Sequence, residues 1–297
     1  MPFWHIMNLK KFFKVFGAGA AIGAGMIIPG VSGGTIAVLL NIYDEVIDSI
    51  NGLRKSFKAS VLFLLPLLLG AAAAIVALYF PIKYALESAP LPTVTLFAGL
   101  MIGGLPKLLK DGTKKGFKPV DTVSCILPFA VVVGICFIPE LGAADLSAGM
   151  PVWGYFALVG VGIIASCALL IPGVSGSMLL LILGYYRPIL DTVSGIFDSF
   201  GHSAAVLALF AAGIIIGFFT IAKLMKWLLT RFPRGTYWAI ISFVIGSIIA
   251  LFLSFNGNFP DAPTTDGFQL GIAGILGVAG IIGAYALTAY AESKSNK

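Results

Sequence analysis

The sequence predicts an all-α polytopic membrane protein with two inverted-topology repeats, each a re-entrant helical hairpin followed by three transmembrane helices. Three observations support this prediction. Of the 297 residues, 59% are hydrophobic and 11% are charged, whereas ordinary soluble domains carry about 25% charged residues. One seven-residue motif occurs twice, nearly half a chain apart. Lys and Arg gather in short segments between long apolar runs, a pattern that sets the orientation of a membrane protein.

The repeated motif is IPGVSGG at residues 28–34 and IPGVSGS at residues 171–177. The offset between the two prolines is 172 − 29 = 143 residues. Over 28–50 and 171–193, nine of 23 positions are identical. Gly/Pro-interrupted hydrophobic segments in corresponding halves are typical of transporters built from internal repeats, and they point to the binding site.

The elements of each half follow in the same order, and together they form one integral membrane domain. Two short apolar pieces flank each PGVSG break, and a run of 14 residues covers only about 21 Å of the roughly 30 Å hydrocarbon layer. We therefore expect each pair to be a re-entrant hairpin, although two full spans remain the alternative. Repeat one, residues 1–140, has its hairpin at 15–50 and spans at 61–80, 93–109 and 121–138. Repeat two, residues 141–297, has its hairpin at 156–193 and spans at 204–222, 237–255 and 268–289.

Charge supports the inversion. A hairpin plus three spans crosses the membrane an odd number of times, so the second repeat must be inverted. With both termini in the cytoplasm, all of the 19 Lys and Arg residues except Lys83 and Arg187 fall on the cytoplasmic side. Because the net charge of +6 is spread over these loops, we expect no nucleic-acid partner.

The two breaks predict an anion site in the membrane. Non-helical backbone at membrane depth is tolerated only where it is buried in protein or lines a cavity. The helix that follows each break starts with unpaired N–H groups, which attract anions. Glycine lets the backbone approach a ligand closely, and hydroxyls add donors. The candidate ligands of an anion are Ser32, Gly33, Gly34, Thr35, Ser175, Gly176 and Ser177.

Charged residues near the hairpins are secondary candidates. Arg187 lies ten residues after Ser177, the last residue of the second motif, and a guanidinium group suits phosphate. The alternative is that Arg187 only reaches the membrane surface at its helix end. Asp44 and Glu45, at the matching place in the first repeat, are candidates for coupling to protons or sodium, or for pairing with loop lysines. Cys125, Cys136 and Cys167 lie in apolar runs without metal-ligand spacing, so we expect no metal and no cofactor.

The paired signatures, PGVSGGTIAVLLNIYDEVI from residue 29 and PGVSGSMLLLILGYYRPIL from residue 172, resemble those of the PopT-type polyprenyl-phosphate (undecaprenyl phosphate) translocases, once labelled only as a domain of unknown function. The resemblance covers essentially the whole chain. It implies a non-enzymatic protein of the prokaryotic plasma membrane that returns undecaprenyl phosphate, a lipid carrier of cell-wall precursors, from the outer to the inner leaflet. The first copy has Asn41 where Gly is expected, and Asn tolerates positive φ.

Other functions remain as alternatives. A secondary transporter of a small inorganic or organic anion could use the same cradle. The segment 30–34 fits G-x-S-x-G, but a hydrolase needs a strand-turn-helix setting and a histidine base, which disfavours a lipid-phosphate phosphatase or serine hydrolase. A scaffold without transport leaves the duplicated breaks unexplained. The sequence leaves open the coupling ion, the chain-length preference and whether the protein forms a homo-oligomer.

Overall fold

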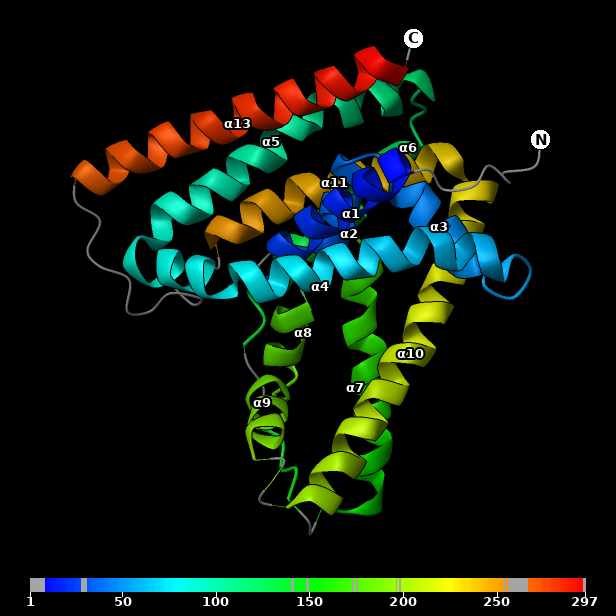
Figure 1. Ribbon diagram of the computed structural model, residues 1–297, viewed down its shortest axis with the longest axis vertical. Coiled ribbons are helices and arrows are strands. Elements are labelled where there is room, and N and C mark those ends of the chain that lie inside the picture. The colour runs from blue at the N-terminus through cyan, green and yellow to red at the C-terminus, as the bar shows by residue number, and fades with distance from the viewer. Residues whose placement is uncertain are drawn as a thin grey trace.

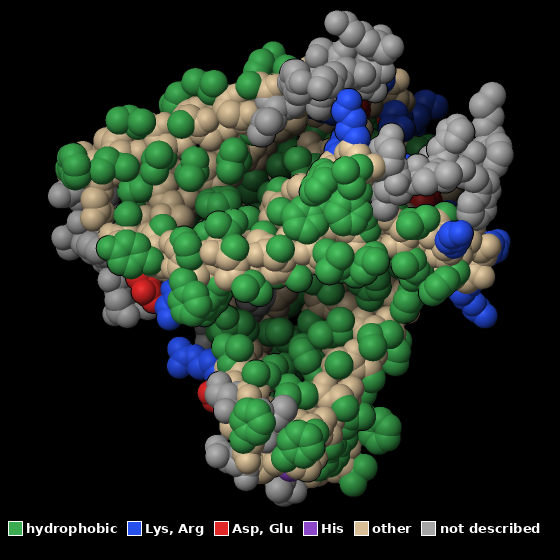
Figure 2. All heavy atoms as spheres, viewed as in Figure 1, with side chains coloured by type: hydrophobic (Ala, Val, Ile, Leu, Met, Phe, Trp, Pro, Cys, Tyr) green, Lys and Arg blue, Asp and Glu red, His purple; other side chains and the backbone are tan. Residues whose placement is uncertain are grey.

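The computed structural model is all-helical in the part it describes, which comprises residues 9–27, 31–139, 142–147, 150–172, 174, 176–195, 197, 199–253, 255 and 267–295. Figure 1 shows long helices packed pairwise, with one short helical pair, at residues 33–52, among them and the other, at residues 176–194, at the edge of the molecule. Within these residues, six helices are long and apolar enough to cross a membrane. In Figure 2, hydrophobic side chains cover most of the visible face. The expected class, an all-α polytopic membrane protein, is therefore confirmed.

The first half of the chain begins with α1 (Leu9–Met26) and two short helices, α2 (Gly33–Leu39) and α3 (Tyr43–Gly52). The long helices α4 (Phe57–Ser88) and α5 (Pro90–Lys114) follow, and then the shorter α6 (Asp121–Ile135). The apolar runs predicted from the sequence lie inside these helices, except that 121–138 forms only 15 helical residues. The chain turns at Cys136 and reaches Pro139, whose ring disfavours helical backbone in the residue before it.

The second half has the same order. It contains α7 (Val152–Leu170), α8 (Gly176–Ile182), α9 (Tyr186–Ser194), α10 (Phe200–Arg231), α11 (Pro233–Leu253) and α13 (Gly267–Ser295). Helices α2 and α8 have seven residues each and begin 143 positions apart, as do α4 and α10, with 32 residues each. The repeat in the motif therefore extends to the order of the helices and to the lengths of these two pairs.

The second arm of each predicted hairpin is two helices rather than one, because a left-handed residue ends the first of them. Asn41 has φ +57° and Gly184 has φ +75°, at equivalent positions. In the first copy, the Asn41 N–H donates to Val38 O (2.9 Å) and the Ile42 N–H to Ala37 O (3.0 Å). The second copy has the same pair of bonds, from 184 to 181 and from 185 to 180. This pattern is the Schellman motif, which satisfies carbonyls at a helix end, and it confirms that Asn41 adopts positive φ.

Glycines bring the first and fourth helices of each half into close contact. A Cβ added at Gly70 of α4 would lie 2.8 Å from the carbonyl carbon of Phe16 on α1. At the equivalent Gly213 of α10, a Cβ would lie 2.9 Å from the carbonyl carbon of Val159 on α7. Small residues at helix crossings allow this backbone approach in membrane proteins. The pairs α1–α4 and α7–α10 are thus two copies of one packing unit (Figure 1).

The fifth and sixth helices pair across the two halves. Helix α5 packs along α13, and α11 packs along α6, and Figure 1 shows α5 and α13 side by side. The Thr95 hydroxyl of α5 is within hydrogen-bond distance of Ala273 O of α13 (3.1 Å) as well as of two carbonyls of its own helix, and Gly280 of α13 lies close to the backbone of Leu96. Because each half supplies one helix to each pair, the halves interlock rather than stand side by side.

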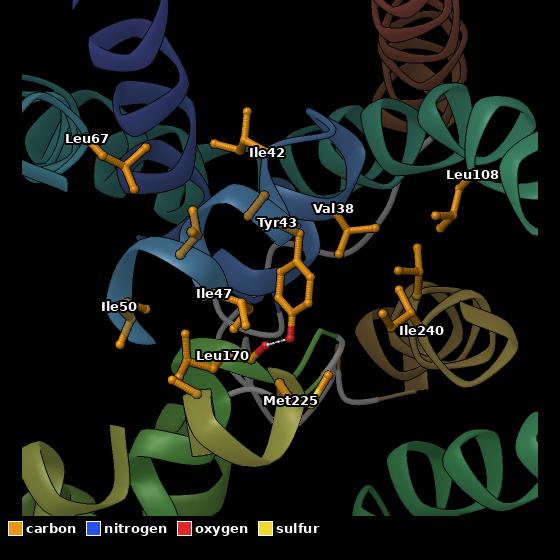
Figure 3. Close-up of a cluster of buried hydrophobic side chains, with 14 of the residues drawn as sticks. Val38, Ile42, Tyr43, Ile47, Ile50, Leu67, Leu108, Leu170, Met225 and Ile240 are labelled. Atoms are coloured by element: carbon orange, nitrogen blue, oxygen red, sulfur yellow. Dashed lines mark hydrogen bonds between the residues drawn. The ribbon is translucent and has the colours of Figure 1, made fainter. Parts of the chain in front are cut away.

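The two short helical pairs differ in their surroundings. Helix α3 lies at the centre of the largest core cluster, where Ile47 and Ile50 are almost fully buried, and it packs against α4 and α10 (Figure 3). Helix α8 packs mainly against α7 and α9, and α9 against α8 and α10. Among the described side chains of α8 and α9, only Ile189 is buried. The structure is therefore asymmetric, with the first short pair enclosed and the second at the periphery.

Candidate functional site

The first break lies against the end of α7, where the second break begins. The Ser32 hydroxyl is oriented to donate to Ala168 O (3.0 Å) and Ile171 O (3.3 Å). A Cβ added at Gly34 would lie 3.2 Å from Leu170 O, so glycine permits this approach. Segments 136 or more residues apart in the chain are therefore joined at the two copies of the motif.

Side chains of the first repeat satisfy the carbonyls that end α7. The last four carbonyls of a helix have no intrahelical partner, and in an apolar setting they need one. The Tyr43 hydroxyl donates to Leu170 O at 2.6 Å (Figure 3), while the Ser32 hydroxyl lies within reach of the carbonyls of Ala168 and Ile171 and can donate to one of them at a time. Both side chains are buried. Since a serine hydroxyl has one proton, Ser32 must release a carbonyl before it can donate to a ligand.

The remaining residues of the first break are enclosed. Gly33, Gly34 and Thr35 form the first turn of α2, and Thr35 is fully buried. Ser32 precedes this helix with extended backbone but makes no side-chain bond to its N–H groups. The enclosed helix start is available to a ligand only through a rearrangement of the packing around it.

The second break is described in part. Gly176 begins α8, and Pro172 is buried. Ser175 and the side chain of Ser177 lie outside the described residues. Arg187 is exposed on α9, which packs against α8 and α10. The structure does not bring Arg187 together with Ser32 and its neighbours, so a joint site would need the α8–α9 pair to move.

Asp44 and Glu45, the predicted coupling residues, line a cavity of about 220 Å³ between α3, α5 and α11. The same cavity contains Lys107, Asp111 and Tyr237. The Tyr237 hydroxyl donates to the Asp44 carboxylate at 3.3 Å, and Lys107 pairs with Asp111 at 3.3 Å. The cavity is thus polar and carries charges of both signs. The nearby Asp48 instead pairs with Lys226 of α10 at 3.2 Å.

A larger cavity, of about 630 Å³, was not anticipated from the sequence. It lies between the start of α6, the end of α10, the start of α11 and the residues Ile171–Pro172. Arg231 and Arg234 line it together with Asp121. In the sequence these arginines only contribute to a basic loop between two apolar runs. Their position in the sequence could have indicated that they lie close together. Arg231 and Arg234 flank Pro233, the residue at which α11 begins.

The comparisons with known proteins agree on one family. A family model described as undecaprenyl phosphate translocase-like matches residues 22–258. The chain is 34% identical to a polyprenyl-phosphate transporter of Staphylococcus aureus, covering 79% of this chain and 84% of that protein. It is 29% identical to a polyprenyl-phosphate transporter of Vibrio cholerae, covering 80% of this chain and 77% of that protein. No solved structure matches the chain. From the extent of these matches, the chain belongs to the undecaprenyl phosphate translocase-like family.

Proposed function

We propose that the protein carries polyprenyl phosphate across the plasma membrane and returns it from the outer to the inner leaflet, without chemical change. The relatives that bear the name polyprenyl-phosphate transporter support this function, and so do the six candidate spans. The observation that carries the proposal is the contact between the breaks, where Ser32 meets the end of α7. A transport site needs elements of both repeats at one place.

The proposed mechanism places the phosphate between the two breaks. Its charge, roughly −1.5 to −2 near neutral pH, is compensated by the N–H groups that begin α2 and α8, by the hydroxyls of Ser32, Thr35, Ser175 and Ser177, and by Arg187. Loss of the Ser32 bond to Ala168 O would free both a donor and the end of α7. The prenyl tail stays in the lipid while the head crosses, so no tunnel for the tail is needed.

The test is leaflet exchange of a labelled polyprenyl phosphate in proteoliposomes. Compared with the wild type, Ser32→Ala/Ser175→Ala and Arg187→Ala should lose most of the exchange, whereas Ser49→Ala should retain it, because Ser49 lies in α3, outside both copies of the motif. Folding of each variant is checked by its unfolding midpoint. Wild-type exchange no faster than in empty liposomes, with and without a proton or sodium gradient, would favour the carrier of small anions. Release of inorganic phosphate would instead indicate an enzyme.

We also propose that the repeats, 1–140 and 141–297, are inverted, with re-entrant hairpins and both termini in the cytoplasm. The support is the charge distribution and the repeated helix order. Single cysteines at Lys115 and Glu87, in a chain whose three cysteines are replaced, should react with a membrane-impermeant maleimide from opposite sides. Labelling of both from one side would contradict this topology.

Asp44 and Glu45 are the proposed coupling residues for protons or sodium, because they share one polar cavity with Asp111 and Tyr237. Exchange by the wild type should then accelerate under an imposed ion gradient, and Asp44→Asn should abolish the acceleration while slower exchange persists. An unchanged response to the gradient in Asp44→Asn would exclude this role for Asp44.

A further inference from the structure

The larger cavity has the size and the composition of a site for an amphipathic ligand. Its volume of about 630 Å³ lies within the range of about 300–1,000 Å³ that is common for ligand pockets. Leu224 and Leu228 on α10, with Ile240 and Phe243 on α11, form much of its wall. Along α10, residues 224, 228 and 231 share one helix face. On this face the apolar side chains of Leu224 and Leu228 are followed by the charged side chain of Arg231, as an amphipathic ligand would require.

The polar end of the cavity carries an excess of positive charge. The side chain of Arg231 is exposed and has no hydrogen-bond or ion-pair partner among the described residues. The Arg234 Nε–H donates to Asp121 Oδ2 at 2.6 Å, and its other N–H groups have no partner in the described part of the chain. Asp121, which is buried, also accepts the Lys118 backbone N–H at 2.7 Å. The positive charge of Arg234 is therefore neutralised by Asp121, and the same bond fixes the position of the Arg234 side chain.

The inner end of the cavity reaches the meeting point of the breaks. Ile171 and Pro172 form part of its lining, and Ile171 O is within 3.3 Å of the Ser32 hydroxyl. A ligand in this cavity would lie beside the candidate transport site but on the side where α10 ends and α11 begins. Ile240 also lines the smaller cavity with Asp44 and Glu45, so one side chain lies between the two cavities.

We propose that this cavity holds polyprenyl phosphate in the membrane leaflet on the side of Arg231 and Arg234, as a docking site before or after passage through the breaks. This inference rests on the proposed function and adds a second place for the same lipid. Arg231 binds the phosphate directly, because guanidinium groups match phosphate oxygens in a bidentate geometry. Arg234, positioned by Asp121, supplies further donors, and the first isoprene units lie along Leu224 and Leu228.

The experiment measures equilibrium binding of a radiolabelled short-chain polyprenyl phosphate to the full chain in detergent, with leaflet exchange measured in parallel. Arg231→Gln should weaken binding by roughly 10- to 100-fold, the range for losing a charged hydrogen-bonding partner. Lys223→Gln is the matched control, because Lys223 is exposed on the same helix and does not line the cavity. It should bind within about twofold of the wild type.

A second variant separates binding from folding. Asp121→Asn removes the negative charge beside Arg234 but keeps an oxygen for the Lys118 N–H, so it should tighten binding by roughly 3- to 10-fold. A purely structural Asp121–Arg234 pair would lower stability in this variant without tightening binding, which would overturn the role of Arg234. Millimolar inorganic phosphate and the neutral polyprenol should displace the probe poorly, because each offers only half of the ligand.

The outcomes distinguish this inference from the proposed function. Exchange by the wild type together with equal binding by Arg231→Gln and Lys223→Gln would overturn the docking site and leave transport intact. Displacement by inorganic phosphate as effective as by the lipid would also overturn it, because the cavity would then hold a free anion. Absence of both binding and exchange in the wild type would overturn the function and the docking site together.

Discussion

Replacing Gly70 with Ala tests whether close backbone contact holds the α1–α4 pair together. The added Cβ would lie 2.8 Å from the carbonyl carbon of Phe16, whereas ordinary contacts begin at 3.4 Å. The helices must therefore separate locally by at least 3.4 − 2.8 = 0.6 Å. A gap of about 0.5–1 Å forfeits roughly a quarter to a half of the dispersion energy of the atoms concerned. Overpacking of this kind costs about 1–3 kcal/mol.

The matched control is Gly17→Ala on α1, where an added Cβ meets nothing within 4 Å. Alanine is favoured over glycine in helices by up to about 1 kcal/mol, so this variant should be as stable as the wild type or more stable. The assay is denaturant unfolding of the purified protein in micelles, followed by tryptophan fluorescence. Gly213→Ala, at the equivalent place between α7 and α10, should resemble Gly70→Ala. Equal midpoints for Gly70→Ala and Gly17→Ala would refute the reasoning.

Three further predictions concern the hydrogen bonds and the turn. Tyr43→Phe leaves Leu170 O unsatisfied and should lower the free energy of unfolding by about 1–3 kcal/mol, whereas Tyr79→Phe, on an exposed side chain, should change it little. Asn41→Ala should lower the same free energy by about 1–2 kcal/mol because of its positive φ, while Asn41→Gly should not; equal losses would contradict the turn. Asn51→Ala removes the bond from Nδ2 to Ala222 O (2.8 Å) and should expose α3 to proteolysis before the rest of the chain is cleaved; unchanged cleavage would argue against this anchoring.

Much of the fold was predictable because the membrane restricts the possible structures. Long apolar runs in a membrane form helices, so the positions of α4, α5, α10 and α11 followed from the distribution of apolar residues along the sequence. The duplicated motif predicted the common helix order of the two halves, and Asn41 was expected to tolerate the conformation that it adopts. The turn at Asn41 and Gly184 still divided the second arm of each hairpin into two helices, a local hydrogen-bonding effect that apolar periodicity does not reveal.

The candidate site was predictable in its residues but not in its contacts. The sequence predicts Ser32 as a hydrogen-bond donor to an anion, but in the structure its hydroxyl is directed at carbonyls at the end of α7. Tyr43 is not among the residues that the sequence marks as a candidate site, yet its hydroxyl donates to Leu170 O in the core. Neither partner can be inferred from the sequence, because each bond joins residues that are more than 120 positions apart.

The sequence by itself determined the membrane class, the internal repeat and the family, because composition, motif spacing and similarity can be read from the residues without their arrangement in space. Tertiary structure decided which helices of one half pack against helices of the other half, and which short helical pair is enclosed. It also decided that Arg231 and Arg234 share a cavity with Pro172. These features depend on packing between distant segments, where glycine contacts and the satisfaction of buried carbonyls select one arrangement among several that the same helices could form.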